Sequence, residues 1–488
     1  MIVLAMALIR PQDVPFGNDE PKLLEGARWM DMTPSVVLGV HLPFTVGTYG
    51  LGGTRGWRYG PLPAWIYQIF FALTSEPQAM VPMRAMLCAG GLVVALLWLA
   101  KIMEVTPWLV VMTMMSPWIW TYSRTLWDNT FCIPLAALLL AAYADFLKRR
   151  RTTSFLLTIV AAAAMLLVHL MSLPIVIAVA LHAAATQYRW MWKHKWAVGA
   201  TLIVLAGIAT PYILECISGD KGPPLPVADR FRFNGYWFPL LGAHHLSGSD
   251  FLQNTFGPDF RHIVAGNGAI GSAAESITLL MYLAAWVGML LAIWRLICAA
   301  RGREPITWMH HLLIVSLATY LLETALDAYK RVFYWPHYHN GTWIVYALFV
   351  WIAIDSLGRF AVAAEYALIA LETAALTVIV AMAAVTIARN AGTGDAGATL
   401  GEQERAIHQM RQFASDSPTD ILLDQWISFP WALEFLKTLP LNEDDQFEHH
   451  GRGLIVSAKP AYPGDSRIMV RDYPAADVEQ LLKSKTPK

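Results

Sequence analysis

The sequence predicts a mainly α-helical, polytopic transmembrane bundle with a small external α/β domain after its last span. Hydrophobic residues make up 56% of the chain and charged residues only 15%, whereas soluble domains contain about 45–50% and about 25%. Apolar runs that match the length of a membrane-crossing helix recur from Met83 to about residue 388. Basic residues gather on one side of these runs, as the positive-inside rule requires.

We expect about eleven spans. The first is the apolar run Ile2–Ile9, which is too short to cross a membrane and is not preceded by a basic segment. We therefore expect either a true start upstream of Met1 or an incomplete first helix. The other spans are expected at residues 85–100, 106–122, 129–147, 154–171, 173–188, 196–217, 275–297, 306–326, 341–357 and 361–388.

The basic segments predict the orientation. They occur at residues 148–151, 189–195, 295–303 and 359, and the positive-inside rule makes their side cytoplasmic. The external side then holds a large first loop (residues 10–82), a second large loop (219–274), two short segments (123–128 and 328–340) and the tail after residue 388.

Two external regions have a predicted structure of their own. In the first loop, Arg58–Leu73 is a short helical pattern started by proline and bearing Trp and Tyr, which suits an interfacial helix. The tail alternates helical and strand-like patterns, so we divide the chain into a transmembrane domain (1–388) and a small α/β domain (389–488). The tail helices are expected at 402–413 and 431–439, and its strands at 420–424, 453–457 and 467–471.

The first candidate site is the acidic pair Asp19-Glu20 in the first loop. A helical pattern follows it (Leu23, Leu24, Ala27), so both carboxylates fall at a helix N-terminus, where the dipole and free N–H groups stabilise negative charge. Such a pair is suited to act as a base at neutral pH. An ordinary acidic helix cap would give the same pattern.

Taken in order, several short motifs resemble the GT-C superfamily of integral membrane glycosyltransferases, which includes protein O-mannosyltransferases and lipid A aminoarabinose transferases. The resemblance covers the whole membrane part. It depends on the order of five segments: Asp19-Glu20, Tyr59-Gly60-Pro61-Leu62 at the start of the interfacial helix, Arg84 at the start of the second span, Ser123–Asp128 at the end of the third, and the aromatic and basic segment Arg331–Pro336.

The resemblance implies transfer of a sugar from a polyprenyl-phosphate or diphosphate carrier to an acceptor hydroxyl on the external face. The acceptor needs a carboxylate base, for which the family position favours Asp19, with Glu20 positioning it or the acceptor. The leaving phosphate calls for guanidinium donors. The external candidates for that role are Arg331, Lys330, Arg124 and Arg58, and further candidate site residues are Tyr59, Tyr334 and His337.

The implied location is a bacterial inner or plasma membrane, with the active site on the external or periplasmic face. The acceptor is expected to be a lipid, a glycan or a protein, and no nucleic acid partner is expected. The family's His-Pro-Pro-Leu and Trp-Trp-Asp-Tyr-Gly-type strings are absent. Their absence argues against a protein O-mannosyltransferase proper and against an oligosaccharyltransferase.

Asp128 has two interpretations. It could pair with Arg124, four residues earlier, or it could share a cavity with Asp19, where a divalent metal could bridge both carboxylates and the phosphate. The metal requirement is left open. The four cysteines lie far apart and support neither disulfides nor a metal site.

The histidines also have two interpretations. His169 stands at a span end and is a functional candidate, although a hydrogen bond to a helix carbonyl would explain it equally well. His244, His245, His337 and His339 could join it in a metal or proton-transfer site, but no zinc-site spacing is present.

A polytopic transporter or flippase is the main alternative function. It predicts paired inverted halves, spans broken at Gly or Pro, and ionisable residues at mid-membrane depth. The polar residues of this sequence cluster instead in the external segments, which favours the glycosyltransferase. Two acidic residues in spans, Glu323 and Asp327, lie near an outer end.

Overall fold

The computed structural model describes residues 11–14, 60–74, 76–218, 268–330 and 339–390, together with short pieces of the first loop and of the tail. The pieces of the first loop are residues 20, 23, 24, 27, 36, 37, 40 and 41. Those of the tail are 400, 401, 404, 420–423, 452–458 and 468–474. The apolar run Ile2–Ile9, the loop 219–267 and most of the two tail helices lie outside this part.

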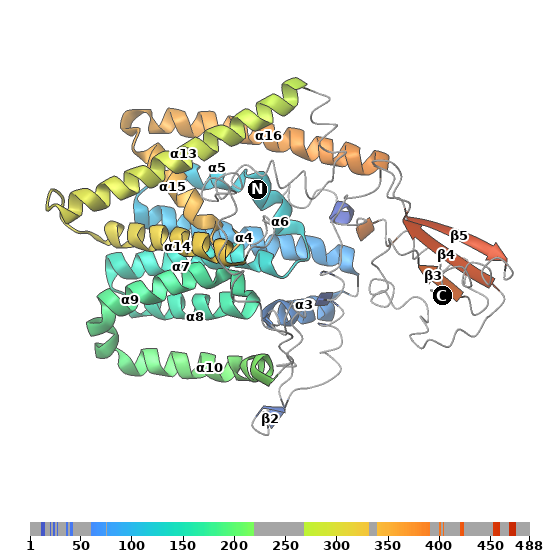
Figure 1. Cartoon of the computed structure of the whole chain (residues 1–488), viewed down its shortest axis with the longest axis horizontal. Helices are drawn as coiled ribbons and strands as arrows, with labels where there is room; N and C mark the ends of the chain where they lie inside the picture. The colour runs from blue at the N-terminus through green and yellow to red at the C-terminus, as the bar shows by residue number, and fades with distance from the viewer. Residues whose placement is uncertain are drawn as a thin grey trace.

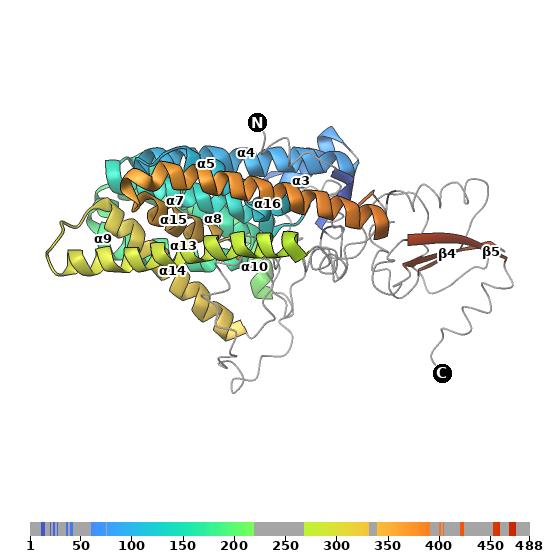
Figure 2. The same ribbon diagram turned by 90° about the horizontal axis from the view of Figure 1, so that it is seen from above.

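The described chain is a bundle of long helices that run side by side (Figures 1 and 2). This confirms the predicted polytopic, mainly α-helical fold class of an integral membrane protein. The long helices of the bundle are α4 (Pro77–Met103), α7 (Cys132–Arg149), α8 (Thr152–Val168), α9 (Leu173–Lys193), α10 (Lys195–Ser218), α13 (Gly268–Ala300), α14 (Trp308–Lys330), α15 (Trp343–Asp355) and α16 (Ala361–Asn390).

In the described part, six helices are long and apolar enough to cross a membrane, and four further apolar helices are shorter. The count of eleven spans therefore stays a prediction. The six long segments are Pro77–Met103, Asn129–Arg149, Leu170–Lys193, Leu283–Ala300, Trp308–Leu326 and Gly358–Val378, and the shorter ones are Leu62–Leu73, Thr152–Val168, Lys195–Thr210 and Trp343–Asp355.

The predicted span 106–122 is wrong as a single helix. The chain forms two short helices instead, α5 (Trp108–Met114) and α6 (Pro117–Arg124), separated by Met115 and Ser116. Proline has no N–H and its ring clashes with a preceding helical turn, so Pro117 ends the helical path and begins a new one.

Two other predicted boundaries are also wrong. Helix α4 begins at Pro77, so Arg84 lies inside the helix rather than at its start. Pro82, the last residue of the predicted first loop, also lies inside this helix. Helix α13 begins at Gly268, so the second external loop ends before residue 268 and not at its predicted end, residue 274.

Helix α15 is the centre of the bundle. Every residue from Trp343 to Ile354 is buried, as expected for a helix that is apolar on all sides. It crosses α13 so closely that a Cβ on Gly288 would lie 1.7 Å from the backbone oxygen of Phe349. Only glycine allows this approach.

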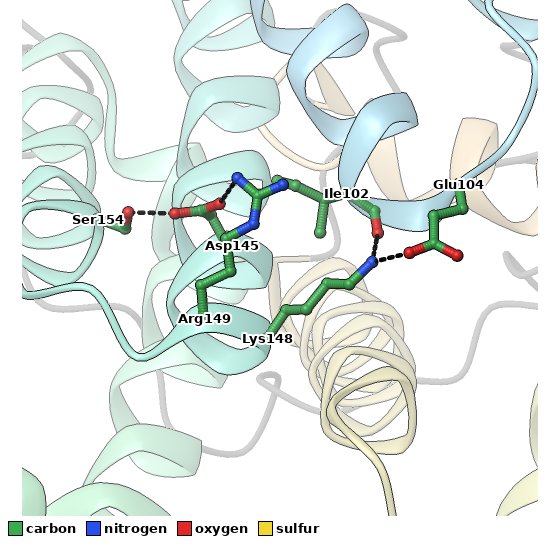
Figure 3. Close-up of polar contacts among 6 residues, drawn as sticks. All are labelled: Ile102, Glu104, Asp145, Lys148, Arg149 and Ser154. Atoms are coloured by element: carbon green, nitrogen blue, oxygen red, sulfur yellow. Dashed lines mark hydrogen bonds and ion pairs between the residues drawn. The ribbon is translucent and has the colours of Figure 1, made fainter.

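Polar contacts join three helices at the basic end of the bundle (Figure 3). The Lys148 ammonium donates to the Ile102 backbone oxygen (2.7 Å) and to Glu104, which ends α4 in a left-handed conformation. This hydrogen bond holds the pKa of the Glu104 carboxyl below its ordinary value. Asp145 of α7 accepts from Arg149 (2.9 Å) and from Ser154 of α8.

The opposite end of the bundle carries the interfacial helix and the tail. Helix α3 (Leu62–Leu73) is started by proline, as predicted. Beyond it lies a three-stranded sheet of order β3-β4-β5, with β3 parallel to β4 and β4 antiparallel to β5 (Figure 1). These strands, β3 (Asp420–Leu423), β4 (Arg452–Ala458) and β5 (Ile468–Pro474), lie where the sequence predicts them. A small hairpin, β1 (Val36–Val37) and β2 (Val40–His41), belongs to the first loop.

A turn of the tail packs on the first loop and on the start of α4. The Leu400 N–H donates to the Val14 backbone oxygen (3.0 Å). Burial raises the pKa of the Glu404 carboxyl to about 7. The nearby Glu76 carboxylate also acts to raise this pKa, whereas a hydrogen bond with the Gln78 backbone acts to lower it. The contact between the tail and the start of α4 therefore includes the Glu404 carboxyl, which titrates near neutrality.

We expect this attachment to weaken as the pH rises from about 4.5 to about 7. The folded pKa of Glu404 lies above its value in a free chain, so the folded state binds the proton more tightly and loses that stabilisation when the proton leaves. Exchange protection of the Leu400 amide, corrected for the intrinsic rate, should fall over this range. The Glu404→Gln variant should keep high protection throughout. A flat profile in the wild type would contradict the assignment.

Candidate active site

Segments that are distant in the sequence meet at the end of the bundle that carries α3. Leu23, Leu24 and Ala27 of the first loop are fully or almost fully buried against the inner face of α3, which includes Tyr67 and Phe70. The same apolar cluster contains residues from the starts of α4 and α7 and the end of α8. Its members there are Met80, Val81, Cys88, Leu126, Phe131, Cys132 and Val168.

Glu20 is held at this junction. Its side chain is only 5% exposed, so it is not a solvated surface cap. Burial raises the pKa of the Tyr67 hydroxyl. The positive charge of Arg84 acts to lower this pKa, and the negative charge of Glu20 acts to raise it. A carboxylate, a phenol and a guanidinium therefore lie together beneath the first loop.

Arg84 holds the turn that follows α6. Its guanidinium is fully buried and donates to three backbone oxygens, those of Tyr122 (2.9 Å), Ser123 (2.8 Å) and Trp127 (3.2 Å). It also lies 4.6 Å from the centre of the Phe131 ring. These carbonyls belong to a helix end and a turn, where backbone oxygens lack helical partners. The Thr125 and Thr130 hydroxyls also donate to the Tyr122 and Trp127 oxygens, at 3.4 and 2.7 Å. The motif order in the sequence indicates this arginine but not its role.

The turn held by Arg84 carries two of the predicted site residues. Arg124 is 4% exposed and lies over the Trp120 ring at 4.5 Å. Asp128 is 2% exposed, and its Oδ1 accepts from the Asn129 N–H at 2.7 Å. Asp128 thus caps the 3₁₀ helix η2 (Asn129–Phe131), a structural function that the sequence analysis had not considered.

His169 occupies the equivalent place at the end of α8. Its Nδ1 accepts from the Met171 N–H (3.0 Å), and its backbone oxygen accepts from the Ser172 hydroxyl (2.7 Å). The ring is 3% exposed and caps the 3₁₀ helix η3 (Leu170–Ser172). Since Nδ1 is an acceptor here, the neutral ring carries its hydrogen on Nε2.

The start of α15 brings a buried polar network to the same place. The Glu323 carboxylate of α14 forms an ion pair with His339 and accepts from the Thr342 and Tyr346 hydroxyls, the latter at 2.8 Å. The sequence analysis named Glu323 only as a charge near a span end. A charged residue in an apolar helix was the available signal.

Two close contacts join this network to the other turns. The Asn340 Nδ2 donates to the Asn129 Oδ1 at 3.0 Å. A Cβ on Gly341 would lie 3.0 Å from the Ser172 Cα, so the chain passes directly against η3. The turns at 128–131, 169–172 and 339–342 therefore form one buried polar centre.

The structure thus brings together the sequence-predicted residues Glu20, Arg124, Asp128 and His169 at one end of the bundle. The other predicted residues are not placed. Lys330 is the last residue of α14, but its side chain lies outside the described part. Also outside it are Asp19, Arg58, Tyr59, Arg331, Tyr334 and His337.

A divalent metal stays a prediction. Within the described residues, no three His, Cys, Asp or Glu side chains converge as metal ligands. Asp19, which the sequence analysis paired with Asp128 for this purpose, lies outside that part.

Gly60 positions α3 against this centre. Its N–H donates to the Val168 backbone oxygen (3.2 Å), and a Cβ at this position would lie 1.8 Å from the Leu167 oxygen. The interfacial helix therefore starts in direct backbone contact with the end of α8, one residue before His169.

We expect Gly60→Ala to push α3 away from α8 and to lower stability by about 1–3 kcal/mol, the usual cost of overpacking. Gly90→Ala is the matched control. No atom lies within 4 Å of a Cβ there, and the substitution in α4 should be neutral or stabilising by up to about 1 kcal/mol. Thermal unfolding of the two purified variants measures the difference. Equal melting temperatures for the two variants would show that the contact between Gly60 and α8 can widen without loss of stability.

Neither a scan of family models nor a search of curated protein sequences finds a match. Among solved structures, the chain is similar to ArnT from Cupriavidus metallidurans in the apo state, with 12% identity, a TM-score of 0.56 and coverage of 97% of this chain and 96% of that one. A structure of the same protein bound to undecaprenyl phosphate matches with 13% identity, a TM-score of 0.46 and coverage of 96% of both chains. The similarity to the apo structure shows that the two chains share a fold over nearly their whole length.

Proposed function

We propose that the protein is a membrane glycosyltransferase that moves a sugar from a polyprenyl-phosphate-type lipid to an acceptor hydroxyl. The proposal is carried by the buried centre at one end of a GT-C-like bundle, where Glu20, Arg124, Asp128 and the Glu323–His339 pair gather. The fold shared with the apo structure of ArnT supports the GT-C resemblance of the sequence and suits a substrate that enters from the lipid.

The proposed reaction needs a base and a site for the leaving phosphate. The acceptor oxygen attacks the anomeric carbon, its proton passes to a carboxylate, and the bond from that carbon to the phosphate oxygen breaks with the electron pair going to the phosphate. We assign the base to Asp19. Glu20, buried beside Tyr67 and Arg84, positions that carboxylate or the acceptor.

We assign the phosphate to Arg331 and Lys330, with Arg124 and Arg58 as further donors, because a guanidinium matches phosphate oxygens in pairs. Along the chain, the segment 331–338 follows α14 and leads directly into His339, which pairs with Glu323 in the polar centre. Tyr59, Tyr334 and His337 would line the sugar. Arg84 is not among the donors, because the backbone of the turn after α6 already binds its guanidinium.

The proposed active site faces the external or periplasmic side of a bacterial inner membrane. Basic residues stand at the opposite end of the bundle, where Lys148 and Arg149 make the contacts of Figure 3. The positive-inside rule supports a cytoplasmic location for that end.

One observation favours the transporter or flippase alternative: the break between α5 and α6, since transporters bind substrates at discontinuous helices. One assay separates the two functions. The protein in vesicles is given a labelled polyprenyl-phosphate sugar and candidate lipid, glycan and protein acceptors. Released polyprenyl phosphate with label on an acceptor supports the transferase. Label that crosses the bilayer with the donor intact overturns it.

A further inference from the structure

Helix α16 carries a buried carboxyl that the proposed reaction does not use. Glu372 is 1% exposed, although most of the apolar segment Gly358–Val378 to which it belongs is not buried inside the protein. In the described part of the chain, neither of its carboxyl oxygens has a hydrogen-bond partner. A buried carboxyl is normally paired or hydrogen-bonded.

The neighbouring contacts place Glu372 along the bundle. Helix α16 packs on α5 and α6, and Tyr366 lies against Trp108 at the start of α5, with ring centres 5.2 Å apart. Glu365 lies seven residues before Glu372, about two turns along the same face of α16, and is hydrogen-bonded to the Thr106 side chain. Both helices run in the same direction from this end (Figures 1 and 2).

Glu372 therefore lies about 10 Å further along α16 than Glu365, at 1.5 Å per residue. Counting the same number of residues from Thr106 along α5 leads to its last turn, just before Met115 and Ser116. The carboxyl thus lies at the level of the break between α5 and α6, within the candidate membrane span Gly358–Val378.

An ionised carboxylate in this place would lack both water and a protein donor. Removing a charge from water without compensation is so unfavourable that such a group binds a proton instead. The helices that pack on α16 supply no acid–base partner for it within the described residues. In the described part, α5 has no titratable or charged side chain. The titratable or charged side chains of the other helices are Tyr122 and Arg124 on α6, Arg295 and Cys298 on α13, Tyr346 and Asp355 on α15, and Glu365 and Tyr366 on α16 itself.

We propose that Glu372 is a proton-binding site in the membrane interior, occupied at neutral pH, beside the break between α5 and α6. The ligand is a proton held as the neutral carboxylic acid. This site is separate from the polar centre and does not depend on the proposed transferase function.

Infrared difference spectroscopy of the purified, folded protein in vesicles at neutral pH tests the proposal. The spectrum of wild type minus Glu372→Gln should contain the carbonyl band of a protonated carboxylic acid and no carboxylate bands. Glutamine keeps the shape and neutrality of the acid, so the melting temperature should not change. Carboxylate bands in the difference spectrum would overturn the proposal.

A second measurement uses the apolar reagent dicyclohexylcarbodiimide, which adds to protonated carboxyls in lipid: the acid oxygen bonds to the carbodiimide carbon and the proton passes to a nitrogen. Mass spectrometry should find the adduct on the peptide with Glu372. The adduct should vanish in Glu372→Gln and persist in the matched control Glu365→Gln. Protection by sodium ions at constant pH would assign the site to a metal cation and overturn the proton assignment.

Discussion

Replacing Asp19 by asparagine should reduce turnover by about 10²- to 10⁴-fold, the usual contribution of a general base. Asparagine keeps the shape of the side chain and removes its ability to accept the acceptor's proton. Binding of the lipid donor should survive, so the loss should fall on kcat rather than on KM. Steady-state release of polyprenyl phosphate from the labelled donor measures both constants.

Two matched variants make this result interpretable. Glu20→Gln should cost less turnover if Glu20 only positions its neighbour. Asp128→Asn should cost little turnover if its main function is to cap η2, since an asparagine oxygen can also accept from the Asn129 N–H. Near-wild-type turnover of both Asp19→Asn and Glu20→Gln would show that the acidic pair is only a helix cap.

Replacing Arg84 by methionine should be the most destabilising single change among the residues of the described part that surround the polar centre. It removes three hydrogen bonds from a charged donor to buried backbone oxygens, and a hydrogen bond that involves a charged group contributes about 1.5–3 kcal/mol. The Tyr122 and Trp127 oxygens keep the weaker Thr125 and Thr130 hydroxyl donors. We expect a loss of at least about 3 kcal/mol, seen as a lower melting temperature in detergent. Transferase activity should fall with it, because the turn carrying Arg124 and Asp128 loses its support.

Arg84→Lys separates charge from geometry. Lysine keeps the charge but not the fork of donors that reaches several oxygens at once, so we expect only partial recovery of the melting temperature. A wild-type melting temperature for Arg84→Met would mean that water or neighbouring groups satisfy these carbonyls. The turn would then not depend on Arg84.

The sequence by itself predicted the class of the fold and the place of most helices. Spans are local features, since about 20 apolar residues suffice to define each one. Short strand-like runs of apolar residues likewise predicted the strands β3 to β5. The residues Asp128 and His169 were found because polar groups at span ends are rare and conspicuous.

Only the tertiary structure decided how these pieces meet. The continuation of α4 through Pro82 does not follow from propensity, which disfavours proline inside a helix. The sequence separates Glu323 from His339, and Asn129 from Asn340, and no periodicity connects them. Their pairing follows from the burial of helix ends, where polar groups without water must find partners on other segments of the chain.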